Sequence, residues 1–487
     1  MEFSKNEFNE WYNDVIEKTG LVDKRYPVKG MNVWMPYGWS IARRIDEILR
    51  ELMFSTNHEE VYFPLLIPKD QFAKEEEHIR GFGGEVFWVD RGGDSPLDIP
   101  LALRPTSETA MYPIFSLWIR THADLPLKVF QIVNVFRYET KQTRVFLRVR
   151  EIHFFEAHTC HRTFEEAENQ INEDREIWKK FCDLLALPYI LNKRPEWDKF
   201  AGADYSIAAD TIMPSGRPLQ IGTMHNYRQN FSKAYDIKFL DENGKRDYVH
   251  QTTFGISERV IGAIVGIHGD DNGLILPPAI APYQVVIIPI LPSKENSNNK
   301  IEINENNKEK ILNESRKFYK EISKNFRVKL DDRDNYTPGY KFYDWEMKGV
   351  PLRVEIGQKE IENNEVTIVR RDIPKEEKNS KRKITVKRDK ALEEIEKLLN
   401  DVQENLKLRA WKMMYDYIEE ASNIDEIRKS NKVNIINWCG SEECAKKIEE
   451  IAGKNVLGIP IEKGEKNGKC AVCGKDTNII CYVGKSY

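Results

Sequence analysis

Long apolar stretches are missing from this chain of 487 residues. No apolar run reaches the roughly 18 residues that a helix needs to cross a bilayer, so we expect no membrane partner. Residues 1–18, MEFSKNEFNEWYNDVIEK, are acidic and amphipathic, whereas a signal peptide starts basic and then turns apolar. Both absences indicate a cytoplasmic protein.

Cysteine and net charge are also low for a chain of this length. Seven cysteines are too few for a disulfide scaffold, and their odd number suits a reducing compartment. Lysine and arginine number 74 against 78 aspartates and glutamates, so the net charge of −4 excludes a polycation. Any nucleic-acid contact must therefore come from local basic patches. The length indicates roughly three domains of about 150 residues each.

A predicted hairpin carries the densest pattern of charge. Residues 129–136 are apolar and β-branched, and residues 146–158 are again rich in strand formers. Arg137 and Glu139 are two positions apart and should share a face. The returning strand adds two more arginines on one face, Arg148 and Arg150. This pattern suits a phosphate-rich ligand, because a guanidinium grips phosphate through two parallel hydrogen bonds. An edge hairpin with solvated charges fits the same residues.

Upstream of the hairpin, apolar residues at helical spacing predict a helix over residues 38–56. A strand is predicted over residues 61–67, and Pro64 places it at a sheet edge or leaving the sheet. The helix and strand could form a dimer surface or be an ordinary helix–strand unit. Residues 75–84 end in glycines and are expected to form a flexible loop.

Short segments downstream have the composition of ligand-binding loops. Thr106 and Glu108 stand at a predicted strand–helix junction, where a hydroxyl and a carboxylate can bind an ammonium group or simply begin a helix. Residues 199–203, KFAGA, are small enough for the backbone to approach a ligand closely. A long helix is predicted over residues 164–185, with Leu184 among its buried residues.

Two further segments place polar residues beside apolar ones. Residues 219–225 are predicted to form a strand, and three polar side chains recur along it: Gln220, Thr223 and His225. A buried helix is predicted to begin near Ser257, which is its expected cap. Arg259 at the start of that helix needs a partner, and a phosphate or an aromatic face would serve.

A rigid proline-rich linker at residues 277–282 marks the first domain boundary. Strands and helices then alternate over about 100 residues, which indicates a small α/β domain with a parallel or mixed sheet. The polar residues 294–308 are expected to form a mobile loop. The charged run 370–390 is either a solvated surface or an RNA-facing one. Residues 391–430 carry a long helical pattern.

Four cysteines near the C-terminus form two close pairs: Cys439, Cys444, Cys470 and Cys473. Their spacing predicts a tetrahedral zinc site, and an all-cysteine site is structural because it leaves no open position. Cys481 lies outside the pairs. Cys160 and Cys182 are expected to be buried as small apolar residues.

Three of these stretches, in this order, resemble the motifs of class II aminoacyl-tRNA synthetases. The helix and strand around Pro64 resemble motif 1, Phe-Arg-Tyr-Glu at 136–139 resembles motif 2, and Gly-Ile-Ser-Glu-Arg at 255–259 resembles motif 3. The whole chain, to its terminal Tyr487, is similar to prolyl-tRNA synthetases of the archaeal/eukaryotic type. The likeness is carried by residues 104–108, 136–159, 199–203 and 220–225 and by the C-terminal cysteines.

This resemblance implies an α+β fold with three domains. They would be a class II catalytic domain with an antiparallel sheet at residues 1–281, an α/β anticodon-binding domain at 282–395 and a small zinc-bearing α/β domain at 396–487. The implied reaction activates L-proline with ATP and Mg²⁺ to prolyl-adenylate and transfers the prolyl group to the 3′ end of tRNA(Pro). The family works as a homodimer.

The resemblance also implies roles for individual residues. Thr106 and Glu108 match the pair that holds the prolyl amine, and Arg137 matches the arginine that bridges the substrate carboxylate and the α-phosphate. Arg137 and Arg259 are the expected catalytic residues. The other expected ATP contacts are Glu139, Arg148, Gln220, Thr223 and Ser257. The expected walls of the proline pocket are Phe154, Glu156, His158, Phe200 and His225. The expected anticodon contacts, Lys341, Glu346 and Arg353, do not come from the resemblance; they are chosen because they belong to a basic surface formed by a predicted helix and strand.

Departures from the family and alternatives to it are visible in the same residues. Ile152 stands where many relatives stack an aromatic ring on adenine, and Phe154 stands where many have tryptophan. Residues 160–251 are too short to hold an editing domain between motifs 2 and 3, so some activation of alanine or cysteine is expected. A threonyl-type enzyme usually has catalytic metal ligands, which this pocket lacks in the sequence. A non-catalytic tRNA-binding protein would not need Arg137, Glu139 and Arg259.

Overall fold

The structure of the protein, a computed structural model, describes residues 3–72, 74, 84–291, 305–375, 382–462 and 465–487. The loops expected at residues 75–84 and 294–308 lie largely outside this range; residues 305–308 belong to helix α9 (Glu305–Ile322). Within the described range no helix is both long and apolar enough to cross a membrane.

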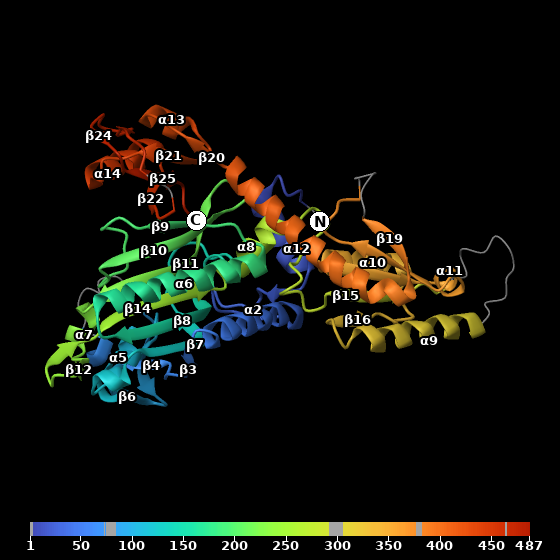
Figure 1. The fold of residues 1–487 in the computed structure, drawn as a ribbon, viewed down its shortest axis with the longest axis horizontal. Helices are drawn as coiled ribbons and strands as arrows, with labels where there is room; N and C mark the ends of the chain where they lie inside the picture. Colours follow the sequence, from blue (N-terminus) through green and yellow to red (C-terminus); the bar gives the residue numbers. More distant parts are fainter. Residues whose placement is uncertain (1–2, 73, 75–83, 292–304, 376–381, 463–464) are drawn as a thin grey trace.

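An eleven-stranded sheet forms the largest part of the molecule (Figure 1). Its central strands run antiparallel in the order β9-β10-β11-β14-β8-β7. Their bounds are β7 (Leu127–Phe136), β8 (Glu151–His161), β9 (Ile190–Lys193), β10 (Tyr205–Ile212), β11 (Pro218–Arg228) and β14 (His250–Ser257). The short strand β3 (Glu59–Glu60) joins the edge in parallel with β7. The expected antiparallel catalytic sheet is confirmed.

Helices α1 (Phe8–Lys18), α2 (Pro36–Phe54), α6 (Phe164–Leu185) and α8 (Arg259–His268) pack on one face of this sheet in a shared apolar core. Alternation along each strand decides which side chains enter that core. Phe155 and Ala157 of β8 lie in it, whereas Phe154, Glu156 and His158 face the opposite side. Gly222 of β11 lies against Trp178 of α6, and a Cβ there would come within 2.5 Å of the indole.

A β-bulge explains how the polar residues of β11 share a face. Ala209 pairs with Gly222 and Asp210 with Gln220, so Ile221 is an extra residue in β11. The extra residue shifts the alternation by one position. Gln220 therefore lies on the same side as Thr223 and His225, although strict alternation would separate it from them.

A second, five-stranded sheet has the order β16-β15-β17-β18-β19. It is mixed, as the alternating strands and helices predicted. Strand β15 runs parallel to β16 and β17, and β18 and β19 are antiparallel to their neighbours. The bounds are β15 (Val285–Pro289), β16 (Val328–Leu330), β17 (Leu352–Ile356), β18 (Glu365–Arg370) and β19 (Lys383–Lys387). Part of the charged run 370–390 thus forms an edge strand. Helices α9, α10 (Pro338–Met347) and α12 (Ala391–Asp416) lie beside this sheet (Figure 1).

Helix α12 runs from the second sheet to the C-terminal strands (Figure 1). The helical pattern expected over residues 391–430 was too long, because α12 ends at Asp416 and is followed by β20 (Ile418–Glu420) and α13 (Ile424–Lys429). The C-terminal strands are β20, β21 (Val433–Asn437), β22 (Asn455–Pro460) and β25 (Ile480–Gly484), with α14 (Glu442–Ala452) beside them. Strand β22 pairs with β9, so these strands continue the large sheet.

Several local predictions were wrong. The strand after the central turn begins at Glu151 rather than at residue 146, so Arg148 and Arg150 lie in the preceding loop and not on a strand face. Strand β7 ends at Phe136, so Arg137 and Glu139 do not share a strand face either. Hydrogen bonds within the loop hold these residues in place instead. One of them runs from Arg137 N to Arg150 O at 2.9 Å.

Three smaller corrections have simple causes. Glu258, not Ser257, occupies the cap position of α8, because β14 extends through Ser257. Leu184 is 40% exposed, and Leu185 takes the buried position at the end of α6. Only residues 66 and 67 of the strand expected over residues 61–67 lie in a strand, β4 (Leu66–Pro68). The residues around Pro64 form no strand, because proline cannot donate to a sheet ladder, and β3 ends before them at Glu60.

Candidate active site

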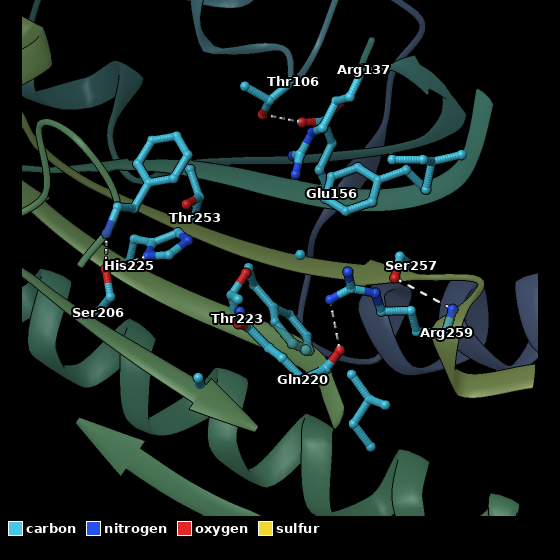
Figure 2. Close-up of a pocket in the computed structure, with 18 of the residues that line it drawn as sticks. Thr106, Arg137, Glu156, Ser206, Gln220, Thr223, His225, Thr253, Ser257 and Arg259 are labelled. Atoms are coloured by element: carbon cyan, nitrogen blue, oxygen red, sulfur yellow. Dashed lines mark hydrogen bonds between the residues drawn. The ribbon is translucent and has the colours of Figure 1, made fainter. Parts of the chain in front are cut away.

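A cavity of about 330 Å³ opens on the face of the large sheet opposite α6 (Figure 2). All the residues for which proline, ATP or adenine contacts were expected line it. They are Thr106, Glu108, Arg137, Glu139, Arg148, Ile152, Phe154, Glu156, His158, Phe200, Gln220, Thr223, His225, Ser257 and Arg259. The fold thus brings together segments that are more than 100 residues apart in the sequence.

One end of the cavity is acidic. Thr106 Oγ1 donates to Glu108 Oε2 at 2.6 Å, and the Tyr227 hydroxyl donates to Glu108 Oε1 at 2.8 Å. Glu108 was expected at a strand–helix junction, and it is the first residue of α5 (Glu108–Trp118). A hydroxyl and a carboxylate held together in this way can accept hydrogen bonds from an ammonium group.

A second buried carboxylate, Glu156, stabilises this end. It accepts hydrogen bonds from Ser107 N at 3.2 Å and from Gln131 Nε2 at 3.1 Å, and it lies 3.1 Å from His158 Nε2. Burial alone would raise the pKa of Glu156, but the hydrogen bonds from His158, Ser107 and Gln131 outweigh burial and lower that pKa. Burial would lower the pKa of His158, but its contact with Glu156 raises it. Glu156 and His158 therefore form an ion pair that fixes the loop before α5.

The other end of the cavity is cationic. Arg259 Nε donates to Leu147 O at 2.9 Å, and Arg137 Nε donates to Pro105 O at 3.2 Å. Arg148 pairs with Glu139 at 3.1 Å. Burial, together with the smaller effect of the charges of Arg137 and Arg148, lowers the pKa of Arg259 to about 10. Burial also lowers the pKa of Arg137. Arg259 stays protonated at neutral pH, so this end favours an anion with several charges.

Arg150 holds the loop that carries Arg137 and Glu139. Its Nε donates to Glu139 O at 3.0 Å, and its guanidinium lies 4.2 Å from the centroid of the Tyr138 ring. The loop is therefore fixed by side-chain contacts to backbone and ring, even though its residues are outside the strands.

No sequence pattern indicated a role for Arg194 or the contacts of Tyr487. Arg194 donates to Asp210 Oδ1 at 2.9 Å, to Gln220 Oε1 at 3.2 Å and to Leu457 O at 2.6 Å. Arg148 Nη2 donates to Tyr487 O, in the last residue of the chain, at 3.0 Å. Both contacts join the cavity to the C-terminal strands. These contacts could be predicted only if the pairing between β9 and β22 were known beforehand.

The three expected anticodon contacts lie on α10 and β17, away from this cavity. Lys341 is 1% exposed and donates to Asp331 O at 3.1 Å, so it does not lie on the basic surface that was expected. Glu346 pairs with Lys375 and with Arg382, each at 2.8 Å. Arg353 pairs with Glu355 at 2.9 Å. Their contact with RNA stays a prediction.

The four paired cysteines converge, as their spacing predicted. The sulfur atoms of Cys439, Cys444, Cys470 and Cys473 all lie within 4.8 Å of one another. Four thiolates at this separation suit a tetrahedral zinc ion. The other three cysteines, Cys160, Cys182 and Cys481, are buried, and burial raises the pKa of each thiol.

Comparisons with known proteins agree along the whole chain. Three family models match: "tRNA synthetase class II core domain (G, H, P, S and T)" at residues 87–268, "Anticodon binding domain" at 284–398 and "Prolyl-tRNA synthetase, C-terminal" at 422–487. The "Proline--tRNA ligase" of Thermoplasma acidophilum is 52% identical over 100% of both chains. That of Pyrococcus abyssi is 50% identical over 99% of this chain and 98% of its own.

A solved structure has the same fold. The Giardia lamblia prolyl-tRNA synthetase in complex with prolyl-adenylate gives a TM-score of 0.93 with 34% identity, over 99% of each chain. The resemblance and the fold class expected from the motifs are confirmed by these relatives. This chain belongs to the prolyl-tRNA synthetase family, among the class II aminoacyl-tRNA synthetases.

Proposed function

We propose that this protein is a proline–tRNA ligase, which activates L-proline with ATP to prolyl-adenylate and transfers the prolyl group to the 3′ end of tRNA(Pro). One observation carries the proposal: a single cavity has an acidic end at Thr106 and Glu108 and a cationic end at Arg137 and Arg259. A zwitterionic amino acid beside a triphosphate has the complementary arrangement of charges.

Thr106 and Glu108 bind the prolyl amine in this proposal. Proline carries a secondary ammonium with two N–H donors, and one hydroxyl and one carboxylate can accept both. Phe154, His158, Phe200 and His225 enclose the ring. Glu156 acts through its hydrogen bonds to Ser107, because it holds the loop on which Thr106 lies.

Arg137 and Arg259 neutralise the phosphates of ATP. The proline carboxylate attacks the α-phosphorus in line and expels pyrophosphate, a step that needs no protein base because the nucleophile is already an anion. Catalysis then rests on positioning, which can contribute on the order of 7–11 kcal/mol, and on charge stabilisation. Glu139, Arg148, Gln220, Thr223 and Ser257 complete the ATP contacts. Mg²⁺ bound with ATP would add charge neutralisation, and Glu139 offers it carboxylate oxygens.

The tRNA contacts both ends of the molecule in this proposal. Its terminal ribose hydroxyl attacks the carbonyl carbon of the prolyl-adenylate in the cavity, which breaks the acyl–phosphate bond and releases AMP. The second sheet binds the anticodon, and Lys341, Glu346 and Arg353 are kept as candidate contacts there. The reaction takes place in the cytoplasm, where the other components of translation are found.

A homodimer is the proposed assembly. The N-terminal region exposes apolar side chains around α2 and the edge strand β3, among them Phe54 at 52% and Tyr62 at 80% exposure. Exposed apolar groups gathered at a sheet edge favour pairing with another surface.

The first prediction concerns the cationic end. Arg137→Ala should lower proline-dependent ATP–pyrophosphate exchange by at least about 10²-fold, because a preorganised donor to developing charge contributes that much. Arg162→Ala is the matched control, since Arg162 is a partly exposed arginine paired with Glu166 on the surface. An Arg137→Ala protein with normal exchange would contradict the assignment.

The second prediction concerns specificity. Alanine and cysteine should support exchange with kcat/KM less than about 10⁴-fold below proline, because each methylene in a pocket contributes only about 1–3 kcal/mol. The signal with alanine must disappear in Arg137→Ala, which separates it from a contaminating alanyl enzyme. Rejection of both amino acids well beyond that factor would show that the pocket excludes smaller substrates by another means.

The third prediction concerns the cysteine cluster. The purified protein should contain one zinc ion per chain by elemental analysis, and Cys473→Ser should lose it and lower the midpoint of thermal unfolding. Cys473 is exposed, so its replacement changes little packing and reports chiefly on the metal. Cys182→Ser, outside the cluster, should keep the zinc. Full zinc content in Cys473→Ser would exclude the four-thiolate site.

The fourth prediction concerns assembly. Sedimentation should give twice the chain mass of 57.0 kDa, and Phe54→Lys should shift the equilibrium to single chains because a lysine is costly to bury. Leu408→Lys is the control, since Leu408 is 68% exposed on α12. A dimer unaffected by Phe54→Lys would place the interface elsewhere.

A further inference from the structure

The hydroxyl of Ser206 joins two parts of the amino-acid pocket. Ser206 lies on β10, directly opposite His225 on β11, and is 2% exposed. Its Oγ accepts a hydrogen bond from Phe200 N at 2.9 Å and lies 2.7 Å from His225 Nδ1. Figure 2 shows Ser206 and His225 beside Thr253, across the cavity from Thr106 and Arg137.

The hydroxyl proton of Ser206 decides which ring nitrogen of His225 carries the proton. Phe200 N–H can only donate, so the serine oxygen accepts there. Among the described residues, His225 Nδ1 is the only other group within hydrogen-bond distance of this oxygen. A buried hydroxyl proton without an acceptor is costly. The hydroxyl therefore donates to Nδ1, which must carry a lone pair.

His225 is consequently the tautomer with its proton on Nε2. Burial outweighs the opposing charge of Glu108 and, with the charge of His158, lowers the pKa of His225 to about 4, so the ring is neutral at pH 7. A neutral imidazole that accepts at Nδ1 carries its proton on Nε2. His225 lines the cavity, so Nε2–H is a donor available to an oxygen of the bound amino acid or its adenylate.

Aromatic neighbours fix the plane of this ring. The His225 ring stacks on Tyr227 with 6.0 Å between centroids and an interplanar angle of 7°, and the Phe200 ring lies 4.8 Å from it on a tilted plane. Ser206 thus controls the tautomer, while Phe200 and Tyr227 control the orientation.

We propose that Ser206 is a positioning residue of the amino-acid pocket, whose hydroxyl holds His225 as an Nε2–H donor and ties the backbone of Phe200 over the bound substrate. This role rests on the proposed function, because it acts on the same proline site. The loop that carries Phe200 has its own ties as well, since Asn230 Nδ2 donates to Gly202 O at 2.9 Å. Loss of Ser206 should therefore loosen the loop without unfolding it.

The decisive measurement compares Michaelis constants for proline and for ATP in pyrophosphate exchange. Ser206→Ala removes both hydrogen bonds and should raise the KM for proline about tenfold, the effect of roughly one such interaction. The KM for ATP should change less than about twofold. Ser206→Thr keeps a hydroxyl and should stay near wild type, and Ser206→Cys, a weak donor of similar size, should fall between them.

A control variant removes a buried serine hydroxyl elsewhere. Ser315 is fully buried on α9 and lies far from the cavity lining. Ser315→Ala should leave the KM for proline unchanged. Thermal unfolding and circular dichroism of each variant separate a local effect from loss of the fold, and Ser206→Cys provides the measurement if Ser206→Ala does not fold.

A double-mutant cycle tests whether Ser206 acts through His225. Adding Ser206→Ala to His225→Ala should raise the KM for proline less than Ser206→Ala does alone, because coupled residues are not additive. The proposal is overturned by an unchanged proline KM in Ser206→Ala, by equal rises for proline and ATP, by a Ser206→Thr variant as poor as Ser206→Ala, or by full additivity in the cycle. Absence of proline-dependent exchange in the wild-type protein would instead refute the proposed function.

Discussion

Repulsion among partly buried guanidinium groups is the constraint on which the cavity depends. Arg137, Arg148 and Arg259 converge there, and the charges of the first two lower the pKa of Arg259 beyond the effect of burial. A folded protein retains such a cluster only if the groups are held by other contacts. Here backbone carbonyls supply most of them: Arg259 donates to Leu147 O and Gln220 O, and Arg137 donates to Pro105 O. An anion bound between them offsets this repulsion, so the cluster favours a ligand with several negative charges.

The antiparallel sheet makes this arrangement possible because it separates its two faces strictly. One face carries the apolar core beneath α6 and α8, and the other carries the polar residues of the cavity. The bulge at Ile221 then corrects the position of Gln220 by one residue. The acidic end is stabilised differently. Glu156, which is paired with His158, accepts a hydrogen bond from Ser107 N and so holds the loop that carries Thr106. The cationic end and the acidic end of the cavity are therefore each held by their own set of contacts.

Much of the fold and of the cavity could be predicted from the sequence. Periodicity located α6, α8 and the strands of the second sheet, and cysteine spacing located the sulfur cluster. The errors have physical causes. Arg148 and Arg150 were placed on a strand because residues 146–150 have strand-forming composition, yet side-chain contacts of Arg150 hold that segment as a loop. Lys341 has a charged side chain and was placed at the surface, but a bond to Asp331 O compensates its burial. Tertiary contacts of this kind produce no periodic pattern in the sequence.

The contacts between the C-terminal strands and the cavity show the same limit most clearly. Pairing of β22 with β9 joins residues 459–460 to residues 192–193, and no local pattern encodes a pairing over that distance. Once the pairing exists, Arg194 at the end of β9 reaches Leu457 O with one nitrogen and Gln220 Oε1 with another. Tyr487, which follows the last of these strands, accepts a hydrogen bond from Arg148 at its carbonyl oxygen. Any displacement of the cysteine-bearing part must therefore move two groups that line the cavity, since both are hydrogen-bonded to its backbone. The C-terminal strands therefore support the active site from outside its lining, through the hydrogen bonds of Arg194 and Arg148.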